Sequence, residues 1–504
     1  MGGCLASPRR VGEPSEEGES TFLSSRSPSC CVAFQSRQIN GKRPYYLCYD
    51  ARSGAAAGSS GRSLRLNGES VTSPCSRFYI EPSRVHAGLV HIRCCYDNKY
   101  WVAQQRQHEG GWAIIGGADE PEEDLSKPTC TLFKTTRVPP HSIRLLHVHR
   151  GKYACLPSSS DDNMIRLLET VSPSLLTGDK EDAIATFTVH DLSEQFVLPR
   201  YLAFKGDNGM YLRARTVERY PYLQFSGRDV GDQAVLNTIH TNDDGTFRVR
   251  SSHVGKFWRR SPNWIWTDST GDPTDDTLFR AIRLSGAGFF ALQNLGNEYF
   301  CKRLTTEGKR SCLNAGTPTI TADARLQLEE AVVSRQIYNV VFDLSEPRIY
   351  GRSVVTMATA SALNGTTSNN TAKLILAYTD TEKRTWVSTV TLKLGVAATI
   401  CTGVPVIVAG GSVEVSAEFS GLYSWGSPVE KETTQKVAYE VTVPPKTRVT
   451  VASTATRAFC DVPFSYTQRD TLFDGRQVTY DMDDGLYTGV NCYDFKYVTS
   501  EENI

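Results

Sequence analysis

The chain carries no net charge, because its 55 basic side chains match its 55 acidic side chains in number. Nucleic-acid binding needs a basic face or stripe, so this composition argues against a nucleic-acid partner. No apolar run reaches the roughly 18 residues that a membrane-spanning helix requires. The first residues also lack the apolar core of a secretory signal peptide. We therefore expect a soluble protein that is made and kept in the cytoplasm.

Motifs for catalysis and metal binding are also scarce. The sequence contains no G-x-S-x-G elbow, no nucleotide-binding loop and no H-E-x-x-H motif. His147 and His149 alternate and could share a metal, but no third ligand is evident, which favours structural histidines. The 14 cysteines are irregularly spaced without a C-x-x-C pair, which indicates free thiols. We expect a binding protein, not an enzyme, with no cofactor and no metal.

The most regular stretch of the chain is an alternation of apolar and polar residues between Val390 and Leu422. Alternation with period two is typical of a β-strand, because successive side chains point to opposite faces. Each arm is about as long as the roughly 9–11 residues of a strand that crosses a bilayer. The expected hairpin has an apolar face made of Leu392, Leu394, Val396, Ala398, Ile400, Val413, Val415, Ala417 and Phe419, and a tip made of Val404, Pro405, Val406, Ile407 and Val408.

Two interpretations fit this hairpin. An amphipathic hairpin with an apolar tip suits a transmembrane β-barrel, which turns one face to lipid and the other to a watery lumen. The same alternation describes a half-buried hairpin of a soluble β protein, and the pattern alone favours this second interpretation.

Residues 1–30 have the composition of a disordered tail, rich in Ser, Gly, Pro, Arg and Glu. The start of this tail approximates a myristoylation signal on Gly2, with Cys4 as a candidate for palmitoylation. Ala6 stands where the motif prefers Ser or Thr, so an unmodified tail is the stronger of the two interpretations.

A long-range repeat divides most of the following chain into two copies. The segment from Gly88 to Trp101 matches the segment from Gly245 to Trp258 without a gap. These matches predict two copies of one domain, at residues 31–190 and 195–332.

Each copy also repeats internally. A strand-like aromatic motif recurs at intervals of 42 to 54 residues, which predicts a pseudo-symmetric β domain. A β-trefoil is the economical solution, because three hairpin pairs close a small barrel without a free sheet edge. The motif occurs at Tyr45-Tyr46-Leu47, Lys99-Tyr100-Trp101, Lys152-Tyr153-Ala154, Met210-Tyr211-Leu212, Lys256-Phe257-Trp258 and Glu298-Tyr299-Phe300.

Short motifs in both copies carry a family resemblance. They include Gly88-Leu-Val-His-Ile-Arg93, Cys130-Thr-Leu-Phe133, Arg144-Leu-Leu-His-Val148, Phe204-Lys-Gly-Asp-Asn-Gly209, Leu223-Gln-Phe225, Lys256-Phe-Trp-Arg259 and Ser261-Pro-Asn-Trp-Ile-Trp266. Through these motifs, residues 31–332 resemble the amaranthin-type plant agglutinins. The resemblance implies tandem β-trefoils that bind galactose- and N-acetylgalactosamine-type glycans at a shallow site where two subunits meet.

Aromatic and amide side chains are the expected sugar contacts, because sugars present an apolar face and a ring of hydroxyls. For Trp258, which follows Lys-Phe in a strand, a core position is at least as good an interpretation. The first copy lacks the Ser-Pro-Asn turn. The candidates are Trp258, Ser261, Asn263, Trp264 and Trp266 in the second copy, and Tyr100, Trp101, His108 and Trp112 in the first.

Residues 333–504 form a third expected domain, rich in Val, Thr and Ser. The alternating hairpin, the following Tyr423-Ser-Trp-Gly426 and the stretch from Val441 to Val451 resemble the aerolysin-like pore-forming module. This resemblance covers most of residues 335–460 and implies rings of subunits whose hairpins form a β-barrel pore. It decides between the two interpretations of the hairpin in favour of membrane insertion.

The expected fold class is all-β, with two tandem β-trefoil domains followed by an elongated aerolysin-like β domain. The expected function is that of a defence lectin that binds glycans, self-associates as a dimer or ring, and associates conditionally with a membrane. The alternative is a cytosolic sugar-binding interaction or stress protein whose third domain only oligomerises.

Overall fold

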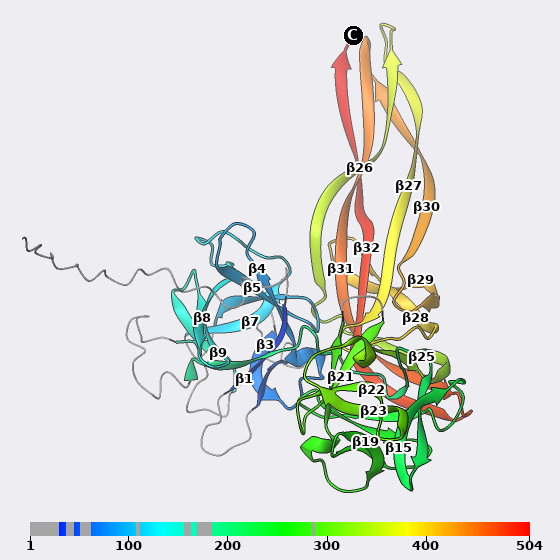
Figure 1. Cartoon of the computed structure of the whole chain (residues 1–504). Helices are drawn as coiled ribbons and strands as arrows, with labels where there is room; N and C mark the ends of the chain where they lie inside the picture. The colour runs from blue at the N-terminus through cyan, green and yellow to red at the C-terminus, as the bar shows by residue number, and fades with distance from the viewer. Residues whose placement is uncertain are drawn as a thin grey trace, which may run out of the picture.

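The computed structural model describes residues 30–36, 45–50, 62–106, 111–155, 163–168, 184–284 and 288–504. The elements in these residues fall into three β-sheets that follow one another along the chain, the last of them long and narrow (Figure 1). The expected all-β fold class is confirmed. The acylation candidates Gly2 and Cys4 lie outside the described residues, as does His108.

The first barrel domain contains β1 (Cys30–Ser36), β2 (Tyr46–Tyr49), β3 (Arg62–Gly68), the 3-10 helix η1 (Pro74–Ser76), β4 (Phe78–Pro82), β5 (Leu89–Cys94), β6 (Tyr100–Gln105), β7 (Trp112–Ala118), β8 (Leu132–Val138), β9 (Ser142–His147), β10 (Lys152–Cys155), β11 (Arg166–Leu167) and β12 (Phe187–Asp191). Six of these strands pair in a closed ring, in the order β1, β4, β5, β8, β9 and β12. The others form the hairpins β2–β3, β6–β7 and β10–β11. A closed ring with three hairpins is the β-trefoil arrangement.

The second barrel domain contains β13 (Tyr201–Lys205), β14 (Tyr211–Val217), β15 (Tyr220–Gly227), β16 (Asn237–Thr241), β17 (Phe247–Ser251), β18 (Phe257–Ser261), β19 (Trp264–Ser269), the 3-10 helix η3 (Asp275–Thr277), β20 (Phe279–Arg283), β21 (Phe289–Asn294), β22 (Phe300–Thr306), β23 (Lys309–Thr317), the 3-10 helix η4 (Ala322–Ala324) and β24 (Leu326–Glu330). Its ring runs β13, β16, β17, β20, β21 and β24. The hairpins β14–β15, β18–β19 and β22–β23 cap one end of this ring, where β15, β19 and β23 pair with one another. The repeated aromatic motif marks the first strand of each hairpin.

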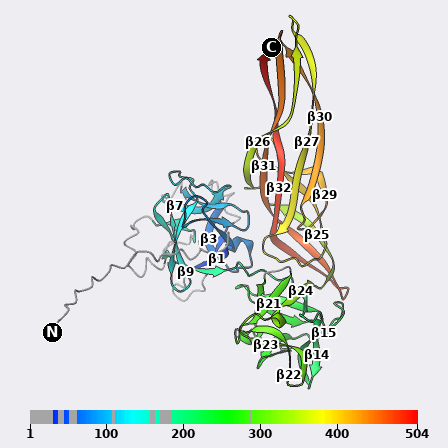
Figure 2. The same ribbon diagram turned by 45° about the horizontal axis from the view of Figure 1, so that its top comes forward.

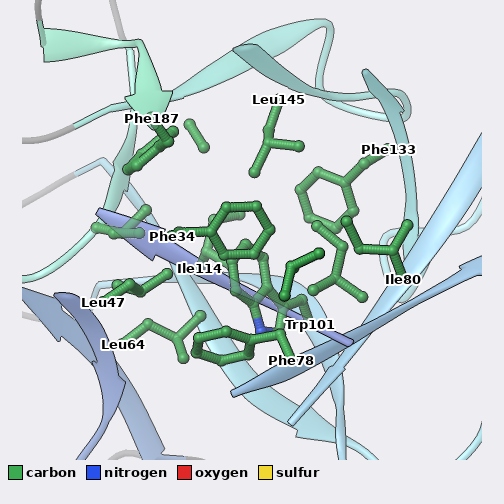
Figure 3. Packing of buried hydrophobic residues seen from close by; sticks show 14 of the residues in the cluster. Phe34, Leu47, Leu64, Phe78, Ile80, Trp101, Ile114, Phe133, Leu145 and Phe187 are labelled. Atoms are coloured by element: carbon green, nitrogen blue, oxygen red, sulfur yellow. The ribbon is translucent and has the colours of Figure 1, made fainter. Parts of the chain in front are cut away.

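A buried tryptophan lies in the core of each barrel. Figure 3 shows Trp101, the one in the first barrel, among its neighbours. The Trp101 ring lies 5.6 Å from Phe34 and 5.2 Å from Phe78, in tilted and edge-on contacts. Trp258 is equally buried in the second barrel and meets Phe279 edge-on at 6.0 Å. Aromatic pairs prefer such geometries, and large aromatic rings contribute most of the burial in a core.

The elongated domain contains β25 (Val332–Phe342), β26 (Arg348–Asn364), β27 (Asn370–Ser388), β28 (Ala398–Ile407), β29 (Val413–Ser424), β30 (Val429–Val443), β31 (Thr447–Leu472) and β32 (Gln477–Asn503). Its sheet has the order β29, β28, β25, β31, β32, β27 and β30, and β26 pairs with β31. Strands β31 and β32 run its whole length, away from the second barrel domain (Figure 2). Towards the chain end, β27–β30 packs on β26 and β31 through an apolar cluster that includes Leu376 and Val451.

A buried charge pair joins the first barrel domain to the elongated domain. Arg348 donates from Nη1 to Asp461 at 2.9 Å and from Nε to the backbone oxygen of Asp119 at 2.7 Å. Asn98 of the first barrel donates to the same Asp461 carboxylate at 2.9 Å. Removing one partner would leave a buried charge without compensation, so this polar contact specifies one docking geometry.

A second buried ion cluster joins the second barrel domain to the elongated domain. Arg335 donates to both oxygens of Asp470, at 2.7 and 2.9 Å, and also to Glu330. Burial alone would lower the pKa of Arg335, but its bonds to Asp470 and Glu330 raise it overall. The other Glu330 oxygen accepts the backbone N–H of Leu394 at 2.8 Å, so the cluster also fixes the segment that leads into β28.

Within the described residues, no helix is both long enough and apolar enough to cross a membrane.

One buried histidine should make the folding stability of the protein depend on pH. His147 donates from Nε2 to the backbone oxygen of Cys130 at 3.1 Å, and burial lowers its pKa from 6.5 to about 4. Between these two values only the unfolded chain binds the proton, so stability falls as the pH drops from 6.5 towards 4. The loss should reach roughly 2–3 kcal/mol at about pH 4.5.

Urea unfolding of the wild type and of His147→Gln, followed by fluorescence at both ends of this range, measures the effect. The variant should lose less stability on acidification, because Gln does not titrate. Equal losses in the two proteins would exclude His147 as the source.

Candidate functional site

Trp101 and Trp258 were predicted to contact sugar from the surface, and this prediction is wrong. Both rings have no exposed surface, because they fill the centres of the two barrels. A sugar would have to replace core packing to reach them. The alternative interpretation of Trp258 as a core residue is therefore the correct one.

The first barrel domain offers little free aromatic surface at the predicted positions. Tyr100 is buried and donates its hydroxyl hydrogen to Glu81 at 2.9 Å, while Arg348 of the elongated domain lies 5.5 Å from its ring. Tyr100 thus belongs to an interdomain contact, which corrects its assignment as a sugar contact. Trp112 is half-buried, and the Arg150 guanidinium covers its ring at 3.3 Å.

The second barrel domain, in contrast, presents an aromatic platform, which we define as Tyr220, Tyr222, Trp264 and Trp266. Tyr220 is 49% exposed and stacks on the half-buried Trp266, with ring centres 4.6 Å apart. Tyr222 and Trp264 are buried and contact each other edge-on at 5.8 Å. Trp264, predicted to contact sugar itself, instead supports the exposed pair, because only 6% of it is accessible.

The platform forms because three hairpins meet at one end of the barrel. Tyr222 on β15 is paired with Trp266 on β19, and Trp264 is paired with Asn314 on β23. Strand alternation places Trp264 and Trp266 on one face and Ile265 in the core. Both platform tryptophans therefore project to the same side.

Charged side chains surround the platform. Arg259 binds Asp268 through two hydrogen bonds of 3.0 and 2.5 Å, and its guanidinium lies 5.9 Å from the Trp266 ring. Lys309 pairs with Glu218 at 3.0 Å. The hydrogen bonds that Arg259 donates to Asp268 raise the pKa of Arg259, and the bond that Lys309 donates to Glu218 raises the pKa of Lys309. These groups can exchange hydrogen bonds with ligand hydroxyls while the rings pack on an apolar face.

Ser261 and Asn263 lie at the turn between β18 and β19, close in sequence to the platform. The Asn263 amide oxygen accepts from Arg260 and from Asn297, each at 3.3 Å. Asn263 is exposed and Ser261 is half-buried, so both remain candidates at the edge of the site. The sequence prediction missed Tyr220 and Tyr222, although Tyr-Pro-Tyr directly precedes the motif Leu223-Gln-Phe225.

The second candidate site is the hairpin β28–β29, whose first arm is shorter than predicted. Leu392, Leu394 and Val396 were expected in a strand but lie in the connection before β28. Leu392 and Leu394 pack against the core of the second barrel, and Val396 packs beside Leu472. Their alternation serves this interdomain contact, because it places apolar side chains towards a neighbouring core.

The predicted apolar tip is also wrong. Val404 and Ile407 are buried in the core of the elongated domain, and Pro405 is paired with Val415 inside the ladder. The chain reverses instead at Gly410 and Gly411, whose φ angles of 84° and 81° favour glycine. No apolar loop is therefore presented at this end of the hairpin by the described residues.

The remaining residues of the predicted apolar face and tip are divided between the core and solvent. In the face, Ala398, Ile400 and Val413 are buried, Val415 and Ala417 are exposed, and the side chain of Phe419 lies outside the described residues. In the tip, Val406 and Val408 are half-buried. In β28 the alternation is real, because Thr399 and Cys401 are exposed between the buried residues. The apolar side of β28 is thus covered by the domain itself.

The protein defined by this architecture has two tandem β-trefoils, an aromatic platform on the second, and an elongated sheet that includes an amphipathic hairpin. The agglutinin domain model matches residues 59–183 and 196–329, which together make up about half of the chain. The chain therefore belongs to the agglutinin domain family. No curated protein matches it.

Three solved structures are similar to parts of the chain. The lamprey immune protein is 13% identical over 62% of this chain and 92% of its own, with a TM-score of 0.29. An aerolysin-like protein from Bombina maxima is 14% identical over 33% of this chain and 99% of its own, with a TM-score of 0.23. Parasporin-2 from Bacillus thuringiensis is 18% identical over 33% of this chain and 74% of its own, with a TM-score of 0.21.

The different positions of Trp258 and Trp266 predict different costs of truncation. Trp258→Ala should lower the free energy of unfolding by about 3–5 kcal/mol, because it leaves a cavity in a closed core. Trp266→Ala should cost clearly less, because part of the ring is already exposed. Urea unfolding of both variants measures the difference, and a smaller cost for Trp258→Ala would contradict the assignment of Trp258 to the core.

Proposed function

We propose that the protein is a carbohydrate-binding lectin whose glycan site is the aromatic platform. The observation that carries this proposal is the exposed Tyr220–Trp266 stack beside the Arg259–Asp268 pair. Rigid rings provide an apolar surface at low entropy cost, and the charged pair can orient hydroxyl groups. Membership of the agglutinin family supports a binding function and not an enzymatic one.

The proposed ligands are glycans of the galactose and N-acetylgalactosamine type, as the sequence resemblance implies. The platform is open to solvent, since Tyr220 is exposed and Trp266 is partly exposed on the hairpins outside the barrel core. A second subunit that covers the sugar from the other side would bury more of the ligand surface. We therefore include self-association in the proposal.

We further propose that the elongated domain forms a membrane pore when several copies assemble, acting in defence after the lectin has associated with a membrane. Support comes from the hairpin β28–β29, which pairs with β25 at only Arg335, Gln336 and Ile337. A released hairpin could bury its apolar face in lipid, where closure among subunits would satisfy its backbone edges. The buried side chains of β28 give the soluble state a way to hide this face.

One observation favours the alternative, a cytoplasmic sugar-binding interaction protein whose elongated domain only oligomerises. The segment from Val404 to Ile407 is built into the core of the elongated domain. Asn491 fixes the end of this segment, because its side chain accepts the N–H of Ile407 at 3.0 Å and donates to the carbonyl of Ile407 at 2.8 Å. Release of the hairpin must break these contacts, whereas a rigid oligomeriser keeps them.

The glycan site predicts a loss of binding when its exposed rings are removed. The double variant Tyr220→Ala and Trp266→Ala should lose retention on N-acetylgalactosamine and galactose beads, because no flat apolar surface remains. Tyr299→Ala is a matched control, since Tyr299 is an exposed ring of the same domain outside the platform. Retention of the double variant at the wild-type level would contradict this site.

The pore hypothesis predicts that the two faces of β29 respond differently to charge. Val415→Arg should abolish dye leakage from liposomes that carry the bound glycan, because arginine facing lipid costs roughly 2–4 kcal/mol near the bilayer midplane in every subunit. Val415 is 41% exposed in the structure, so the soluble fold should tolerate the change.

Glu414→Arg is the matched control, because Glu414 is exposed on the opposite face of the same strand. It should retain leakage. No leakage from the wild type, with glycan binding intact, would instead support the alternative function. Equal leakage from both variants would exclude β29 as a membrane-crossing strand.

A further inference from the structure

Two tight turns of the second barrel domain hold residues in an unusual backbone conformation. Each of the hairpins β14–β15 and β22–β23 closes with only two residues between its paired strands. The first turn is Glu218-Arg219, with φ angles of 50° and 71°, and the second is Glu307-Gly308, with φ angles of 50° and 74°. Two-residue hairpin turns with positive φ at both positions are of type I′, for which Asn-Gly is strongly preferred.

The glutamates in these turns lower the stability of the hairpins. A side chain clashes with the backbone at positive φ, so glycine adopts this conformation more easily than other residues. Gly308 follows this rule, whereas Glu218, Arg219 and Glu307 do not. Strained residues of this kind persist where the surrounding structure holds them in place, and they are concentrated at binding and active sites. The side chains of these residues are therefore candidates for a role in binding.

The side chain of Glu307 contacts the aromatic platform. Its Oε2 accepts the Nε1–H of Trp264 at 3.4 Å, which is long for a hydrogen bond. Glu307 is exposed, and among the described residues Trp264 is the one hydrogen-bond partner of its carboxylate. A carboxylate can accept about four hydrogen bonds, so most of this capacity is left for solvent or a ligand. One long hydrogen bond at the surface does not explain why glutamate occupies the strained position.

Glu218 joins the two turns. Its carboxylate pairs with the ammonium of Lys309, the residue after the second turn, at 3.0 Å. A Cβ added to Gly308 would lie 3.6 Å from Glu218 Oε1, so the two turns are in contact. The first turn also leads directly into Tyr220, whose ring is exposed on the platform. The contact therefore places the turn that contains Glu307 beside the platform.

We propose that Glu307 determines the specificity of the glycan site, because its carboxylate accepts hydrogen bonds from the ligand while the ligand packs on Tyr220 and Trp266. This inference rests on the proposed lectin function. A carboxylate accepts hydrogen bonds and donates none, and bonds to an ionised acceptor are roughly twice as strong as those between neutral groups. The site should therefore select ligands that present hydroxyl or amide N–H donors next to the apolar face that covers the rings. Galactose offers hydroxyl donors, and N-acetylgalactosamine offers an amide N–H in addition.

Glu307→Gly distinguishes a role in binding from a role in stability, because its two expected effects have different signs. The variant lacks the carboxylate, so its affinity for N-acetylgalactosamine in titration calorimetry should fall about tenfold or more. It also lacks the strain, so its melting temperature should stay equal or rise by up to a few degrees. Glu307→Gln keeps the size and the strain of the side chain, and it should lose less affinity because its amide oxygen still accepts hydrogen bonds.

Glu298→Gly is the matched control, because Glu298 is the same residue type at a similar φ of 57° in the same domain. Glu298 precedes β22 and Glu307 follows it, so the two residues lie at opposite ends of this strand. The control should show the same direction of change in melting temperature. Its affinity for N-acetylgalactosamine should equal that of the wild type.

Three results would overturn the inference, and they separate it from the proposed lectin function. Unchanged affinity in a folded Glu307→Gly variant would overturn the role of Glu307 and leave the lectin function intact. Lower affinity together with a lower melting temperature in that variant would assign Glu307 a structural role. Absence of binding by the folded wild type to both N-acetylgalactosamine and galactose would overturn the proposed glycan site and the role of Glu307 with it.

Discussion

The relative arrangement of the domains depends on the buried cluster of Arg335, Glu330 and Asp470. Glu330 ends the last strand of the second barrel, Arg335 lies near the start of the elongated sheet, and Asp470 lies on its central strand β31. Buried charges are costly to separate, so the cluster allows one geometry where an apolar contact would allow several. Through the N–H of Leu394, the same cluster fixes the chain that leads to the hairpin.

Much of the fold could be predicted from the sequence because it is built by repetition. The aromatic motif around Tyr100, Phe257 and their equivalents marks the first strand of each trefoil hairpin, and closure of the ring follows from three such units. The spacing of the aromatic motif does not show whether a given ring lies in the core or on the surface, since successive side chains of a strand point to opposite faces. Trp258 and Trp266 look alike in the sequence, and only the assembled barrel buries the first and leaves the second half-buried.

The bounds of the hairpin were predicted wrongly because of contacts between domains. The alternation from Leu392 to Ile400 is continuous in the sequence, but a neighbouring core takes up Leu392 and Leu394 before the strand begins. The polar contacts could not be predicted for a similar reason. Arg348 and Asp461 are far apart in the chain, and Asp461 also accepts from Asn98 of another domain. The order of apolar and polar residues shows which face of a strand is apolar, but not which part of the molecule will cover that face.

The hairpin strands β15 and β23 lie at the end of the second barrel domain that is farthest from the elongated sheet (Figures 1 and 2). A molecule held by this end on a glycan-bearing surface would stand upright, with its long axis along the surface normal. Copies anchored in this way lose two of their three rotational freedoms and meet one another side by side. Because the anchored molecules are already oriented, they would lose less rotational entropy when subunits associate.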